Sequence, residues 1–149
     1  MEKIKVAVIG AGGKMGTRTS NNLVTKFPDK FDVKLVETFP PAVERIEKER
    51  GLKVTPVDEA LAFADVVIFA VPDTLIKKLS AEYVPMLKPG TVFLILDPAA
   101  AVAKELTLRD DCTFGVAHPC HPSYFKWQKE EEAYQDRFGG EGGHQDIVM

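Results

Sequence analysis

The stretch KIKVAVIGAGGKMG, residues 3–16, decides the fold of this chain. Its first half, Lys3–Ile9, is rich in β-branched residues and predicts a buried strand. Glycines end this run at once, and the residues from Met15 to Lys26 predict a helix that stops before Phe27-Pro28-Asp29. A strand, a tight glycine turn and a helix in immediate succession are typical of the first unit of an α/β protein.

The rest of the chain repeats this alternation of strands and helices. The run VVIFAV at Val66–Val71 is continuously apolar, as expected of a central parallel strand that is covered on both faces. The further predicted strands are Asp32–Glu37, Val66–Val71, Thr91–Leu96 and Thr113–Ala117, and the predicted helices are Ala42–Arg50, Val57–Ala64, Thr74–Leu87 and Ala99–Leu106. The alternation predicts an α/β fold, a Rossmann-type doubly wound, mainly parallel sheet with helices on both faces.

Composition limits the classes of protein to which the chain can belong. It has 149 residues, of which 45% are hydrophobic and 28% charged, enough for one globular core. The net charge of −3 and the scattered basic residues argue against nucleic acid or a membrane surface as a partner. No apolar run is long enough for a membrane span, and Cys112 and Cys120 make no disulfide framework, so we expect a cytoplasmic protein.

The domain organisation follows from a change in composition near the end of the chain. Residues 1–125 are expected to form the Rossmann domain, and residues 126–149 a charged and glycine-rich tail or linker.

The glycine turn predicts a binding site for the pyrophosphate of a nicotinamide dinucleotide. Glycines permit a tight bend and a close approach of the backbone, and the following helix N-terminus offers free N–H groups and a partial positive charge. The spacing fits G-x-x-G-x-x-G, with Gly12 additional; a tight turn that binds no ligand is the alternative. The predicted contacts are Gly10, Gly12, Gly13, Lys14, Met15 and Gly16.

Glu37 closes the second predicted strand, about twenty residues beyond the turn, where a carboxylate accepts hydrogen bonds from the adenosine ribose. A carboxylate there repels a 2′-phosphate, and Thr38, Phe39 and Pro40 offer no guanidinium to hold one. NAD is therefore expected as the cofactor, in preference to NADP. The alternative is that Glu37 is a solvated charge at a strand end.

Ligands of open parallel sheets sit at the carboxyl ends of the strands. Val71 and Pro72, at the end of the most apolar strand, would form an apolar wall beside the cofactor's ribose or nicotinamide. Asp97 ends the next strand and would orient a ligand. Each of these residues has a simpler interpretation as part of a turn that ends a strand.

His118 and His121 lie in the segment His-Pro-Cys-His-Pro directly after the last predicted strand. An imidazole, with an ordinary pKa of about 6.5, suits transfer of the hydroxyl proton when an alcohol is oxidised. These histidines would alternatively bind a substrate carboxylate or phosphate, or be structural. A metal site from His118, Cys120 and His121 is a weaker alternative, since the spacing matches no common zinc pattern, and no metal is expected.

Three segments carry a family resemblance: Gly10-Ala-Gly-Gly-Lys-Met-Gly16, Ala64-Asp-Val-Val-Ile-Phe-Ala-Val-Pro72 and Leu87-Lys-Pro-Gly-Thr-Val92. They resemble the superfamily of β-hydroxyacid, 6-phosphogluconate and prephenate dehydrogenases, with ketol-acid reductoisomerase a more distant relative. Phe114-Gly-Val-Ala-His-Pro-Cys-His-Pro122 resembles the phosphogluconate dehydrogenase-like oxidoreductases that include D-apionate oxidoisomerase. The resemblance covers residues 3–125.

The resemblance implies an NAD(P)-dependent oxidoreductase, or its cofactor-binding domain, that transfers hydride between nicotinamide and a small hydroxy or sugar acid. It also implies a second, helical domain beyond the tail, which completes the substrate pocket and usually forms a homodimer. In the β-hydroxyacid enzymes a catalytic lysine comes from that domain, and no residue of this sequence can take its role. The alternative is a non-catalytic module that binds and senses nicotinamide dinucleotides.

Overall fold

A computed structural model describes residues 2–120, 131–136, 143 and 147–149 of the chain. His121, one of the two predicted catalytic histidines, lies outside the described residues. The strands are β1 (Ile4–Ile9), β2 (Phe31–Val36), β3 (Val66–Phe69), β4 (Val92–Ile95), β5 (Thr113–Val116), β6 (His118–Pro119) and β7 (Ile147–Val148). The α-helices are α1 (Lys14–Asn21), α2 (Pro40–Glu44), α3 (Val57–Phe63), α4 (Asp73–Tyr83) and α5 (Ala99–Val102). Single turns of other helix types are η1 (Asn22–Lys26), η2 (Arg45–Glu49), η3 (Val84–Met86) and η4 (Glu131–Gln135).

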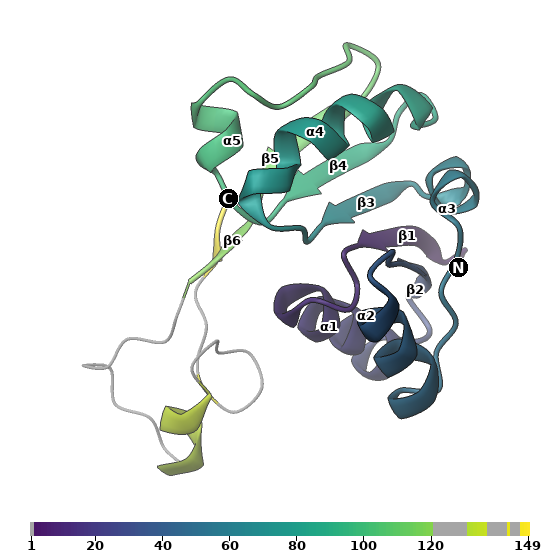
Figure 1. Ribbon diagram of the computed structural model, residues 1–149, viewed down its shortest axis with the longest axis vertical. Helices are drawn as coiled ribbons and strands as arrows, with labels where there is room; N and C mark the ends of the chain where they lie inside the picture. The colour runs from purple at the N-terminus through teal and green to yellow at the C-terminus, as the bar shows by residue number, and fades with distance from the viewer. Residues whose placement is uncertain (1, 121–130, 137–142, 144–146) are drawn as a thin grey trace.

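Five strands form one parallel sheet in the order β2-β1-β3-β4-β5 (Figure 1). In the register of the central strands, Val8 of β1 lies opposite Leu35 on one side and Ile68 on the other. One further residue, Val54, pairs with Leu35 in the parallel sense beyond β2. It occupies the place of the strand that flanks β2 in the classical six-stranded order, so the predicted Rossmann-type fold is confirmed.

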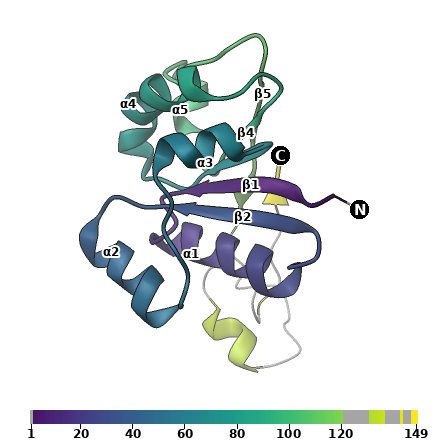
Figure 2. The same ribbon diagram turned by 90° about the vertical axis from the view of Figure 1, so that its right-hand side faces the viewer.

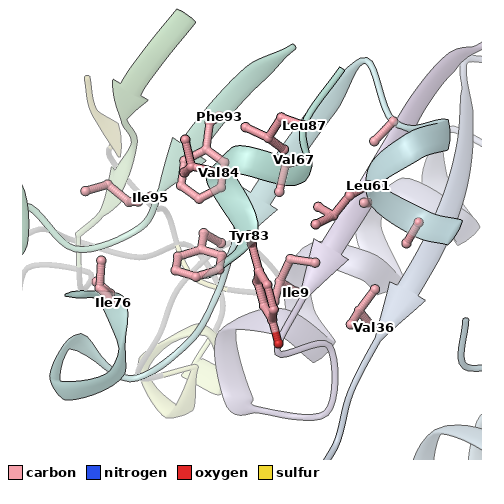
Figure 3. Close-up of a cluster of buried hydrophobic side chains, with 14 of the residues drawn as sticks. Ile9, Val36, Leu61, Val67, Ile76, Tyr83, Val84, Leu87, Phe93 and Ile95 are labelled. Atoms are coloured by element: carbon pink, nitrogen blue, oxygen red, sulfur yellow. The ribbon is translucent and has the colours of Figure 1, made fainter. Parts of the chain in front are cut away.

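The helices cover both faces of the sheet, as predicted. Figure 2 shows α3, α4 and α5 on one side of β1 and β2, and α1 and α2 on the other. The pleat of β1 sends Ala7 and Ile9 into the larger hydrophobic cluster, under α3 and α4, and Val6 and Val8 into the smaller one, under α1 and η2. The larger cluster is built around Phe69 and Phe93, whose ring centroids lie 5.0 Å apart (Figure 3).

The topology places a crevice at the carboxyl ends of β1 and β3. The chain leaves β1 for β2 on one side and returns to β3 on the other, so the connections diverge between these two strands. In open α/β sheets ligands bind at this switch point. The glycine turn follows β1, and the segment Ala70–Pro72 follows β3, so both border the crevice.

Parts of the tail lie against the first helix. Arg18 of α1 donates a hydrogen bond of 2.8 Å from Nη2 to Oδ1 of Asp136, and both side chains are largely buried. β6 pairs in the antiparallel sense with β7, His118 lying opposite Val148. The boundary between residues 1–125 and 126–149 stays a prediction. In the described part of the chain, no helix has the length and apolar character needed to cross a membrane.

Candidate functional site

The glycine turn brings β1, β3 and α1 so close together that Gly10 and Gly16 leave no room for a side chain against the neighbouring backbone. Gly10 has a φ of +76°, and a Cβ there would lie 2.6 Å from the carbonyl oxygen of Ala70. A Cβ at Gly16 would lie 2.1 Å from the carbonyl oxygen of Gly10. Gly16 is buried and lines neither of the pockets described below. These two glycines set the shape of the turn.

Gly13 has a different position, because it faces the crevice and begins α1. A Cβ there would meet nothing closer than 3.4 Å in the protein. Gly13 is the N-cap residue of α1 and has no side chain that could cap the first turn of the helix. Lys14 and Met15 follow Gly13 and line the same crevice. This arrangement fits an anion at the helix N-terminus.

Glu37 fixes the glycine turn from the end of β2. Its Oε2 accepts a hydrogen bond of 3.0 Å from the Gly12 N–H, and its Oε1 accepts bonds from the N–H groups of Thr38 and Phe39 at 2.8 and 3.0 Å. Gly12, additional in the sequence motif, thus has a defined role. A Cβ on it would lie 2.6 Å from the Cβ of Ala42, which leaves no room for a side chain.

Arg45 binds the carbonyl group of Gly12, a contact that the sequence analysis did not predict. Its Nη2 donates to the Gly12 carbonyl oxygen at 3.2 Å. The three residues after Glu37 include no arginine. Arg45, eight residues after Glu37, begins η2 and lies next to the glycine turn. A cation therefore lies near the predicted ribose site together with the carboxylate.

Two pockets of similar size line the crevice and meet at its centre. The His118-side pocket, about 430 Å³, is bordered by Met15, Asp97 and His118. The Glu37-side pocket, about 410 Å³, is bordered by Glu37 and by apolar side chains of α4. Both pockets share Gly13, Ala70, Val71 and Pro72. The structure therefore brings the predicted glycine turn, apolar wall, carboxylate and histidine into one groove.

His118 presents a defined ring nitrogen to this groove. Its Nδ1 lies 2.9 Å from the carbonyl oxygen of Leu96, which can only accept, so Nδ1 carries the proton and donates. In the neutral ring Nε2 is then the acceptor. Asp97 borders the same pocket, but its Oδ1 accepts a bond of 2.8 Å from the Ala99 N–H, the role of a turn residue.

The metal-binding alternative has little support in the described residues. Among residues 2–120, 131–136, 143 and 147–149, no three His, Cys, Asp or Glu side chains gather as a metal site. Cys120 is a free thiol whose Sγ lies 3.7 Å from the carbonyl oxygen of His118. His121 lies outside these residues.

The Glu37-side pocket has a wall that the sequence does not reveal as part of a site. It consists of Phe39 and of one stripe of α4, Leu75, Leu79 and Tyr83. The spacing of four residues signals a common helix face, but such a stripe ordinarily indicates a core contact. Only the packing of α4 beside the switch point turns its edge toward a pocket.

Two carboxyl groups with a lowered pKa, Asp65 and Asp111, lie away from the groove. Asp65 precedes β3 at the opposite edge of the sheet, where Lys88 Nζ donates to it at 2.5 Å. That hydrogen bond, together with one from the Lys5 N–H, lowers the pKa of the Asp65 carboxyl. Arg109 lowers the pKa of Asp111 in the same way. These are structural ion pairs rather than parts of the site.

A family model described as the acetohydroxy acid isomeroreductase, NADPH-binding domain, matches residues 1–120. The chain belongs to this family. The isomeroreductase NADPH-binding domain is a dinucleotide-binding unit, so the NAD(P) binding predicted from the glycine turn is confirmed, as is the predicted resemblance to the ketol-acid reductoisomerase and 6-phosphogluconate dehydrogenase group.

Two curated relatives are both D-apionate oxidoisomerases. The one from Blautia hydrogenotrophica is 72% identical over 149 residues, which is 100% of this chain and 51% of the relative. The one from Rhizobium rhizogenes is 46% identical over 143 residues, 96% of this chain and 51% of the relative. The isomeroreductase-family chain thus spans about half the length of the curated relatives it matches.

A solved structure shares the same architecture. It is the crystal structure of a semialdehyde dehydrogenase NAD-binding protein from Cupriavidus necator in complex with calcium and NAD, with a TM-score of 0.88 and 44% identity. The match covers 98% of this chain and 52% of the other. The fold of the isomeroreductase-family domain is therefore one that holds NAD in a protein of nearly twice the length.

Proposed function

We propose that this chain is the NAD-binding half of an oxidoreductase that acts on a sugar acid of the D-apionate type. The observation that carries the proposal is the groove across the switch point, with Glu37 at one end, Gly13 at its centre and His118 at the other end. The D-apionate oxidoisomerases, 72% and 46% identical, support the substrate class.

The residues of the groove fit the parts of a dinucleotide in order. The Glu37-side pocket would take the adenosine, with the carboxylate accepting from the ribose hydroxyls. The N-terminus of α1 at Gly13 would take the pyrophosphate, because Gly13 has no side chain and a helix N-terminus carries a partial positive charge. The His118-side pocket, with Val71 and Pro72 at its wall, would take the nicotinamide.

We propose NAD rather than NADP as the cofactor. Glu37 is fully engaged at Oε1 by two N–H groups, whereas Oε2 has one and retains room for a ribose hydroxyl. A phosphate on that hydroxyl would meet the carboxylate at contact distance. Arg45, bonded to the Gly12 carbonyl, is the group that would favour NADP, and the family description names NADPH. Binding measurements on variants of both residues decide between them.

His118 is proposed as the proton acceptor of the reaction. A bound nicotinamide would supply the hydride acceptor for oxidation of a substrate hydroxyl to a carbonyl. The Leu96 carbonyl holds the His118 ring in the tautomer with Nε2 unprotonated, so Nε2 can accept the hydroxyl proton. Asp97 borders the same space and, with Oδ1 bound to Ala99, would orient a substrate hydroxyl only through its other oxygen. His121 stays a predicted second candidate.

The binding part is tested by titrating the purified chain with NADH and with NADPH, following nicotinamide fluorescence. We expect NADH to bind in the micromolar range and NADPH more weakly. Glu37→Ala should weaken NADH binding, and Arg45→Ala should leave it within about twofold. Two results together would overturn the NAD assignment. The wild type would bind NADPH more tightly than NADH, and Arg45→Ala would lose NADPH binding but keep NADH binding.

The catalytic part needs a complete enzyme. A chimaera in which this chain replaces the matching half of the Blautia hydrogenotrophica D-apionate oxidoisomerase provides one, given the 72% identity. His118→Gln in the chimaera should lower kcat by 10²–10⁴-fold, the usual contribution of a general base, with NADH affinity retained. Cys120→Ser, two residues away, is the matched control and should keep activity. Unchanged turnover in His118→Gln would refute the role of the imidazole.

The remaining expectations stay predictions. They are the homodimer, the cytoplasmic location and the absence of a metal. A non-catalytic module that binds and senses nicotinamide dinucleotides stays the alternative prediction from the sequence. An active chimaera whose activity depends on His118 would remove it.

A further inference from the structure

Tyr83 ends α4 with a side chain that belongs partly to the core and partly to the Glu37-side pocket. The residue is 6% exposed, and its ring meets Phe69 edge-on, with centroids 6.4 Å apart and planes at 87°. This packing fixes the ring in one orientation. Figure 3 shows the Tyr83 oxygen at the far end of the ring from α4, beside Ile9, the last residue of β1.

The Tyr83 hydroxyl makes no hydrogen bond to any of the described residues. Among the described residues, Arg50 Nε is the only fully buried side-chain nitrogen or oxygen without a hydrogen-bond partner, so the Tyr83 hydroxyl is accessible to a ligand or to water. Burial, with a smaller contribution from Glu82, raises the pKa of Tyr83, so the phenol stays protonated and can both donate and accept. A fixed, protonated and unpartnered hydroxyl at a pocket wall is suited to a ligand.

The rest of that pocket restricts what the ligand group can be. Its apolar lining includes the side chains of Val36, Phe39, Leu75 and Leu79. Apart from Tyr83, the polar side chains that line it are Glu37 and Thr38, at the end of β2. A flat, mostly apolar ring with hydrogen-bonding atoms on its edge fits such walls, and a charged group does not.

We propose that the Tyr83 hydroxyl hydrogen-bonds the adenine ring of the dinucleotide and thereby positions the adenosine half of the cofactor. The inference rests on the proposed function. With the pyrophosphate at Gly13 and the ribose at Glu37, the base must lie in the remaining, apolar part of the Glu37-side pocket, which Tyr83 borders. The edge of adenine offers ring nitrogens that accept and a 6-amino group that donates, and a phenol can pair with either.

The test compares Tyr83→Phe with the wild-type chain, using two probes. NADH contains the adenosine, and reduced nicotinamide mononucleotide lacks it. Tyr83→Phe should bind NADH about 3–10-fold more weakly, the effect of one hydrogen bond, and should bind the mononucleotide as the wild type does. Its melting temperature should be equal or higher, because no bond within the protein is lost. Tyr134→Phe, a tyrosine of η4 that lines neither pocket, is the control and should bind NADH normally.

The outcomes separate this inference from the proposed function. If the wild type binds neither NADH nor NADPH, the proposed function fails. If the wild type binds NADH and Tyr83→Phe binds it equally well, only the role of Tyr83 is refuted. An equal loss of affinity for the mononucleotide would also refute it, since that probe has no adenine.

A third probe, the reduced nicotinamide purine dinucleotide, locates the bond. It has a hydrogen in place of the 6-amino group and keeps the ring nitrogens as acceptors. A penalty of Tyr83→Phe that vanishes with this analogue assigns the hydroxyl to the 6-amino group, and a penalty that persists assigns it to a ring nitrogen. Both results support the proposal.

Discussion

Replacing Gly16 by alanine tests the claim that this glycine shapes the turn without touching the ligand. The added Cβ would lie 2.1 Å from the carbonyl oxygen of Gly10 and 2.8 Å from two further backbone atoms, Ala11 Cα and Gly10 C. No flexible side chain can move aside, so the start of α1 must retreat from β1 by roughly 1 Å, at the upper end of the 1–3 kcal/mol that overpacking costs. Alanine regains about 1 kcal/mol of helix propensity.

The net loss is therefore about 2 kcal/mol, which for a chain of this size lowers Tm by about 4–8 °C. Calorimetry or a circular-dichroism melt measures it. Gly13→Ala is the matched control, because its φ of −71° suits alanine and its new Cβ would meet nothing closer than 3.4 Å. It should keep the wild-type Tm yet bind NADH at least tenfold more weakly, since its methyl group enters the groove. A wild-type Tm for Gly16→Ala would refute the packing argument.

Three further predictions concern charged groups. Glu37→Gln keeps one of the two acceptor oxygens that hold the turn and removes the charge that repels a 2′-phosphate. The ratio of NADPH to NADH affinities should therefore rise about tenfold by titration, and an unchanged ratio would show that the Glu37 carboxylate does not contact the ribose. Arg50→Met deletes bonds of 2.7–2.8 Å to α1, including one to buried Ser20, and should lower the free energy of unfolding by about 1–3 kcal/mol in urea titrations, whereas equal midpoints would contradict it. Asp65→Asn should lower Tm at pH 7, because the bond from Lys88 depresses the pKa of Asp65 and stabilises the folded state above the ordinary carboxyl pKa; the difference should shrink as the pH falls below about 4, and a difference that is constant with pH would rule this out.

The strands could be predicted because each is a dense apolar run, but their ends depend on contacts that the runs do not contain. The run Val66–Val71 predicts six strand residues, whereas β3 ends at Phe69, since the chain bends at Val71 and Pro72 caps the start of α4. The start of β1 at Ile4 and the glycine turn agree closely with the prediction, because charged residues precede this apolar run and glycines follow it in the sequence.

The helix predicted at Ala99–Leu106 shows where local propensity is overridden. α5 ends at Val102, because Lys104 adopts a left-handed φ of +59° and the Glu105 N–H bonds to the Ala100 carbonyl at 2.8 Å. The chain then turns so that Leu106 packs on the larger hydrophobic cluster. No glycine or asparagine marks this stop, so the sequence gives no signal for it.

The residues of the site that follow strands were predictable from motif and position, whereas those that α4 and η2 contribute were not. Gly13, Glu37 and His118 follow strands, and the carboxyl ends of parallel strands share one edge of the sheet. Tyr83 lines the Glu37-side pocket from the end of α4, and Arg45 binds the glycine turn from the start of η2. Their places depend on how α4 and η2 pack, which no spacing in the sequence states.

Glu37 binds the N–H of Gly12, and Arg45 binds its carbonyl oxygen. This arrangement has a consequence for protein engineering. The carboxylate that would select the cofactor also anchors the loop that would hold either cofactor's pyrophosphate. Exchanging Glu37 for a small or basic residue, the usual first step in switching an enzyme from NAD to NADP, would therefore loosen the loop for both. A useful switch needs a second substitution that restores an acceptor for the Gly12 N–H, so the two changes should be sought as a pair rather than one after the other.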